Sequence, residues 1–98
     1  MMDSEQMNAH AGQAAALLKI LANENRLKIL CALVDREMSV GELYERLDLS
    51  QSALSQHLAR LREQEIVKTR RVAQTIYYSL HSKSASHIIR VLHKLYCQ

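Results

Sequence analysis

The sequence has no proline, no tryptophan and no phenylalanine, and it has only two glycines among its 98 residues. With so few residues that break helices, the ends of helices have to be located from capping residues and polar breaks. Four tyrosines are the only large aromatic residues, although 48% of the residues are apolar. We therefore expect a core built from aliphatic side chains.

Long apolar runs are also missing. No run approaches the roughly 18 residues of a membrane span, and no signal-peptide pattern opens the chain. We therefore expect a cytoplasmic protein without a membrane partner, in which the two cysteines are thiols rather than a permanent disulfide. The sequence has no Gly-rich phosphate-binding loop and no carboxylate pair at a useful spacing, so it disfavours an enzyme, and we expect no cofactor.

The charge is divided unevenly between the two halves of the chain. Residues 1–49 contain five Lys or Arg and eight Asp or Glu, a net charge of −3, whereas residues 50–98 contain eight and two, a net charge of +6. A concentrated positive charge favours contact with nucleic-acid phosphates, because binding then releases counterions. A solvated basic surface without a partner is the alternative.

The segment from residue 39 to residue 62 predicts two short helices joined by a tight turn. Ser39 followed by Glu42 is a capping box, and the apolar residues of this first helix are Val40, Leu43 and Leu47. Ser50 can cap the second helix, whose apolar stripe consists of Leu54, Leu58 and Leu61. Two such helices form a helix-turn-helix, although an ordinary pair of surface helices has the same pattern.

The second of these helices has an outer face suited to the major groove of DNA. Opposite the leucines, this face is small, polar and uncharged, and no acidic residue appears before Glu63. Gln can make a bidentate contact to adenine, Ser can contact any base, and Ala can meet a thymine methyl group. The residues of this helix that we expect at double-stranded DNA are Gln51, Ser52, Ser55, Gln56 and Arg60.

A small β-hairpin is predicted after the helix-turn-helix. Residues 66–71 and 75–80 alternate in character and are rich in β-branched residues and tyrosine, as strands are. A hairpin in this position is a wing, and we expect it to hold DNA phosphate through residues near its tip, namely Lys68, Arg70 and Arg71. The connection at 72–74 lacks the Gly or Asn of a tight turn, so we expect a looser loop.

Three further helices are predicted, at residues 4–21, at 24–35 after an Asn23 cap, and from Ser82 or Ser84 to Tyr96. The first is rich in alanine, and the last has a broad apolar face made of Ala85, Ile88, Ile89, Leu92 and Leu95. A chain of this size has little left to cover these surfaces, which indicates a homodimer. The fold class is therefore mainly α with a small β-hairpin: a homodimeric winged helix-turn-helix in one domain spanning residues 1–98.

This order of elements, together with LANENRLKILCAL, LSQSALSQHLARLRE and TIYYSL, closely resembles the ArsR-type winged-helix transcriptional regulators. The resemblance covers nearly the whole chain. It implies a homodimeric, operator-binding regulator of transcription, either a repressor or an anti-silencer, that an inducer releases from DNA. The glycines usual in that family before and within the wing are replaced here by Glu65 and by residues 72–74.

The resemblance also bears on the inducer. Metalloid-sensing members have Cys-Val-Cys where this sequence has Ser39-Val40-Gly41, and the ligands of zinc-type members are missing from the last helix. The remaining candidates, Cys31 and Cys97, resemble the cysteine pair of the thiol-based subgroup of HlyU-like and BigR-like regulators. This resemblance implies a redox switch in which reactive sulfur species or an oxidant bridge the two cysteines. Two alternatives stay open: Cys31 is simply a small buried hydrophobic residue and Cys97 a residue of the chain end, or an atypical His/Cys set that includes His93 and Cys97 makes the protein a metal-responsive repressor.

Overall fold

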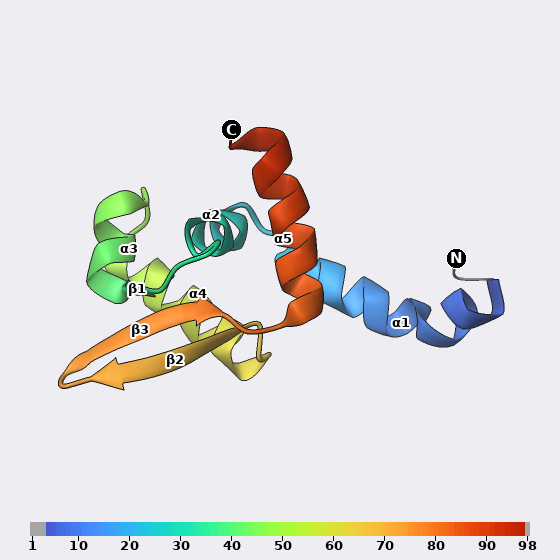
Figure 1. Cartoon of the computed structure of the whole chain (residues 1–98), viewed down its shortest axis with the longest axis horizontal. Helices are drawn as coiled ribbons and strands as arrows, with labels where there is room; N and C mark the ends of the chain where they lie inside the picture. Colours follow the sequence, from blue (N-terminus) through green and yellow to red (C-terminus); the bar gives the residue numbers. More distant parts are fainter. Residues whose placement is uncertain (1–3, 98) are drawn as a thin grey trace.

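The computed structural model describes residues 4–97, which form five helices and a small sheet (Figure 1). The sheet has three antiparallel strands in the order β1-β3-β2, and its hairpin extends to one side of the helices. The elements are α1 (Ser4–Leu21), α2 (Glu24–Ala32), β1 (Met38–Ser39), α3 (Val40–Arg46), α4 (Gln51–Glu63), β2 (Val67–Val72), β3 (Thr75–Leu80) and α5 (Lys83–Tyr96). The order is that of a winged helix-turn-helix, as predicted.

Polar caps set the beginnings of α2, α3, α4 and α5, which confirms the predictions made from these capping residues. Ser39 and Glu42 form the full capping box, with bonds of 2.9 and 3.1 Å between each backbone N–H and the other side chain. Single side-chain caps begin the helices α2, α4 and α5, and these caps are Asn23, Ser50 and Ser82. Of the two serines considered for the last helix, Ser82 is therefore the cap.

Two boundaries between α2 and α3 differ from the prediction. The helix α2 ends at Ala32 rather than near Asp35, because residues 33–35 form a turn in which Asp35 takes a φ of 60°. The expected linker then ends in the short strand β1, where Met38 pairs with Tyr78 and Ser39 with Tyr77. Two residues are too few to show a period of alternation, so the sequence pattern did not reveal this strand.

The wing differs from the prediction at its turn. Val72 pairs with Thr75, so the connection is a tight two-residue turn and not the looser loop expected from the absence of glycine. Ala73 supplies the left-handed conformation with a φ of 54°, and Glu65 before the wing has a φ of 58°. L-residues adopt this region at a cost. The two positions where family glycines were missing thus keep a glycine-like backbone.

The core is aliphatic, as expected from the composition. It contains no charged or polar residue among those described, and the three leucines of α4 are at most 1% exposed. Its members are Leu21, Ile29, Leu30, Leu33, Met38, Leu43, Leu54, Leu58, Leu61, Ile66, Val67, Ala85 and Ile89. In the described range 4–97, no helix is long and apolar enough to cross a membrane.

Candidate nucleic-acid interface and thiol pocket

The helix α4 presents its polar face to solvent because its leucines fix the opposite face in the core. All five DNA-contact candidates on this helix are exposed, and those at the centre of the outer face are Ser52 and Gln56. Within the first turn no acidic side chain is present. The helix therefore offers neutral hydrogen-bonding groups where base edges would lie, with Gln51, Ser55 and Arg60 around them.

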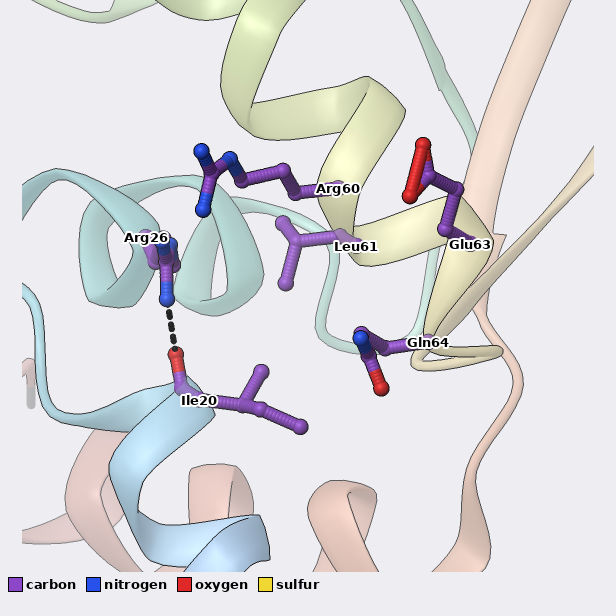
Figure 2. Close-up of a pocket in the computed structure, with 6 residues that line it drawn as sticks. All are labelled: Ile20, Arg26, Arg60, Leu61, Glu63 and Gln64. Carbon is purple, nitrogen blue, oxygen red and sulfur yellow. Dashed lines mark hydrogen bonds between the residues drawn. The ribbon is translucent and has the colours of Figure 1, made fainter.

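Arg60 lies on the flank of α4 rather than at the centre of its outer face. Figure 2 shows its side chain extending from α4 on the side where α2 carries Arg26. Both arginines line a pocket of about 300 Å³ between the end of α1, α2 and the end of α4. Arg60 is therefore placed to contact a phosphate beside the groove rather than a base within it.

Arg26 connects three helices at this pocket. Its Nη1 donates to the carbonyl oxygen of Ile20 at 3.0 Å, the bond drawn in Figure 2, and its Nε donates to Nδ1 of His57 at 3.4 Å. Burial, followed by the charges of Arg26 and Arg60, lowers the pKa of His57. His57 is half-buried at the edge of the leucine stripe, and the bond that its ring accepts from Arg26 links α4 to α2.

The wing residues do not all lie where the sequence suggested. Arg71 is near the tip, because it stands one position before Val72 of the turn-closing pair, and its Nε donates to the carbonyl oxygen of Ala73 at 3.2 Å. Lys68 was expected near the tip but lies at the base, paired with Ser79. The predicted strand 66–71 already placed Lys68 in the half away from the turn, so its assignment to the tip did not follow from the predicted bounds.

Arg70 already has a carboxylate partner, which sequence reasoning missed. Its guanidinium contacts the Glu37 carboxylate through bonds of 2.8 to 3.1 Å and lies 5.3 Å from the centre of the Tyr77 ring. The bonds with Arg70 lower the pKa of the Glu37 carboxyl. The pairing of β1 with β3 brings Glu37 to the wing. A partner 33 residues away leaves no local sequence signal.

The two cysteines line one pocket of about 300 Å³ between α2 and α5. Cys31 is half-buried on α2, and Cys97 is exposed just after the last residue of α5. The other residues around the pocket are Glu24, Leu27, Lys28, Leu92 and Tyr96. The fold thus brings together two thiols that are 66 positions apart in the sequence.

The environment of the thiols distinguishes the two cysteines. Burial raises the pKa of the Cys31 thiol, and the neighbouring Cys97 thiol raises it further. A thiol with a raised pKa is a slow nucleophile at neutral pH, since the thiolate is the reactive form. The exposed Cys97 is therefore the more accessible point of attack. Within residues 4–97, no three His, Cys, Asp or Glu side chains form a group that could hold a metal ion.

Comparison with known proteins supports this structural assignment. Residues 23–69, from the cap of α2 into β2, match the family described as bacterial regulatory protein, arsR family. The chain is 55% identical over 97 residues to the transcriptional activator HlyU of Vibrio cholerae, covering 99% of this chain and 90% of that protein. The chain belongs to the ArsR family of transcriptional regulators.

Solved structures of relatives share the fold of this ArsR-family regulator. Reduced HlyU from Vibrio cholerae has 55% sequence identity and a TM-score of 0.88, covering 96% of this chain and 99% of that one. The transcriptional repressor BigR from Xylella fastidiosa has 40% identity and a TM-score of 0.87, covering 97% of this chain and 94% of that one. The resemblance to HlyU-like and BigR-like regulators stated from sequence motifs is consistent with these matches.

Proposed function

We propose that this regulator binds its operator as a homodimer, as a repressor or an anti-silencer, and that bridging of Cys31 and Cys97 lowers its affinity for DNA. The inducer is a reactive sulfur species or an oxidant. One observation carries the proposal: the two thiols line the same pocket, one on α2 and the other at the end of α5. A bridge there links α2 to α5, and both helices contribute buried residues to the core.

The exposed polar face of α4 supports sequence-specific binding to double-stranded DNA. Ser52, Ser55 and Gln56 supply donors and acceptors for base edges, with Gln51 beside them. Arg60 and the wing supply positive charge for the backbone, mainly through Arg71, because Glu37 neutralises Arg70. Lys68, at the base of the wing, remains a candidate for a more distant phosphate.

Exposed apolar side chains on α1 and α5 support a homodimer. Met7 and Leu18 on α1 are 45% and 53% exposed, and Leu95 on α5 is 67% exposed. The helix α1 extends away from the rest of the protomer, so its surface is open to a second copy (Figure 1). In a two-fold dimer the two α4 helices can enter successive major grooves about 34 Å apart.

Contacts between α5 and the α2–β1 segment support the coupling between the thiol pocket and the DNA-binding surface. Arg90 of α5 donates to Asp35 at 2.6 Å, and Glu37, two residues on, holds Arg70 of the wing. A bridge that shifts α5 against α2 therefore acts on a segment attached to the wing. HlyU, a relative, has been described in a reduced form, and BigR is named a repressor.

The test is a DNA-binding assay on a genomic fragment beside the protein's own gene. We expect the reduced protein to bind tightly, a persulfide to release it, and dithiothreitol to restore binding. Cys31→Ser and Cys97→Ser should bind normally and resist release, since neither can form the bridge.

Three outcomes would overturn the proposal. Release of the double Cys→Ser protein by persulfide would place the sensing group elsewhere. Release of the wild type by low zinc, under conditions where persulfide has no effect, would favour a metal-responsive regulator. Failure of the reduced protein to bind any fragment more tightly than random DNA would remove the sequence-specific function itself.

A further inference from the structure

The pocket around Cys31 and Cys97 has a lining that selects among the reagents able to reach these thiols. Apart from the two cysteines, the pocket is lined by Leu27, Leu92 and Tyr96 and by the side chains of Glu24 and Lys28, and nearly all of its lining surface is apolar. A reagent that enters loses contact with water and gains almost no hydrogen bond in return. Such a pocket favours hydrocarbon groups and penalises ionised ones.

The charged residues beside the pocket cancel one another. Glu24 and Lys28 are one helical turn apart on α2, with 3.6 Å between the Lys28 ammonium and the Glu24 carboxylate. Because the pair has no net charge, it provides little attraction for an anionic reagent. The apolar lining and the absence of net charge on the ion pair both favour an uncharged ligand.

We propose that this pocket binds small, uncharged organic polysulfides, R–S–S–S–R with short alkyl or allyl groups, and disfavours sulfur donors that carry charged groups. The proposal rests on the dithiol function above and names the class of inducer for the same site. The hydrocarbon arms contact Leu27, Leu92 and Tyr96, which holds the sulfur chain beside the exposed Cys97 thiol.

The reaction needs no further reagent. The Cys97 thiolate attacks an outer sulfur of R–S–S–S–R, forms a Cys97–S–S–R mixed disulfide and expels R–S–S⁻. Cys31 then loses its proton to solvent, attacks the Cys97 sulfur and expels R–S⁻, which leaves a Cys31–Cys97 disulfide. The two leaving groups take up protons to give R–S–S–H and R–S–H. The two thiols are oxidised by two electrons, and the trisulfide is reduced by the same two electrons.

The test compares two trisulfides that share the reacting sulfur atoms and differ only in their arms. Dipropyl trisulfide is apolar, whereas glutathione trisulfide carries several charged groups. The rate of bridging in the reduced full-length protein is followed by mass spectrometry, as the loss of two hydrogens, and each rate is divided by that of the same reagent with free N-acetylcysteine. We expect the normalised rate with dipropyl trisulfide to be at least about tenfold higher.

Variants of the lining sharpen the test without disturbing the core. Tyr96 is 80% exposed, so Tyr96→Glu should fold normally while placing a charge at the pocket, and it should reduce the preference to near unity. Tyr44→Glu, at a tyrosine 45% exposed on α3, is the matched control and should leave the preference unchanged. Glu24→Gln leaves Lys28 unpaired and should raise the rate with glutathione trisulfide alone.

The outcomes separate this inference from the function on which it rests. Equal normalised rates for the two trisulfides, with a bridge formed by both, would overturn the apolar selection and leave the dithiol switch intact. An unchanged preference in Tyr96→Glu would also overturn it, since the lining would then have no part in selection. If neither reagent forms a bridge between Cys31 and Cys97, the dithiol function itself fails.

Discussion

The helices α4 and α5 are both amphipathic and both begin at a serine cap, yet they bury their apolar residues to different extents. In α4 the three leucines are at most 1% exposed, so the protomer by itself buries the whole apolar stripe. In α5 Ala85 and Ile89 are fully buried, whereas Val91 and Leu95 are 58% and 67% exposed. The outer face of α4 is thus free for a polar ligand, while α5 still has apolar surface that favours a protein partner.

The largest effect expected from this comparison is on stability. Leu61→Ala should lower the free energy of unfolding by about 2 to 5 kcal/mol, because it leaves a cavity beneath α4. Leu95→Ala removes the same atoms from a side chain that is 67% exposed and should change protomer stability far less. Urea unfolding at several protein concentrations measures both, and equal losses would contradict the contrast between the two helices.

The next effect concerns assembly. Leu95→Glu should weaken the dimer roughly a hundredfold, since the variant buries an unpaired carboxylate at the interface. Leu92→Glu is a less clean test, because Leu92 also packs against the core and lines the thiol pocket. Sedimentation equilibrium gives the dissociation constant. A monomeric wild type that still binds DNA tightly would contradict the dimer itself.

A smaller effect distinguishes base recognition from backbone contact. Gln56→Ala should lose about 1 to 3 kcal/mol on the preferred site and relax specificity there. Arg71→Ala should weaken binding to all sequences alike and reduce the salt slope by about 0.9. Arg70→Ala should change the slope less, because Glu37 already neutralises Arg70. Equal losses for Gln56→Ala on specific and random DNA would exclude Gln56 as a base contact.

The smallest effect tests a backbone position outside both helices. Glu65→Gly should raise the free energy of unfolding by about 0.5 to 1 kcal/mol, because Glu65 has a φ of 58° that glycine adopts without strain. Glu63→Gly, two residues earlier at the last residue of α4, is the control and should lower stability by at most about 1 kcal/mol, because glycine loses more conformational freedom on folding. Thermal unfolding compares the two, and loss of stability in Glu65→Gly would show that this residue has compensating contacts.

The sequence predicted correctly those features that depend on residues close together in the chain, and it missed features that depend on contacts between distant segments. Local signals, such as the Ser39 capping box and the leucine spacing of α4, correctly predicted the helix-turn-helix. The short strand β1 and the bonds between Glu37 and Arg70 were missed because they join segments far apart in the chain. The tight turn was missed because Ala73 takes a conformation that its residue type disfavours.

The candidate site shows the same division. Helical periodicity alone predicted which side chains of α4 face outward, since one helix determines its own faces. Placing Cys31 and Cys97 together needed the packing of α5 on α2, which the spacing of the two cysteines does not encode. The position of Lys68 was misjudged for a different reason, because the predicted strand itself placed this residue away from the wing tip.

The central claim is that a Cys31–Cys97 bridge weakens DNA binding, and the most direct measurement is the operator affinity of the isolated bridged protein. The bridged form is purified, its mass and bridge position are verified, and its dissociation constant is compared by fluorescence anisotropy with that of the reduced form. Cys31→Ser taken through the same oxidation is the control. The account predicts a dissociation constant at least about tenfold higher for the bridged form, and equal constants for verified bridged and reduced protein would contradict it.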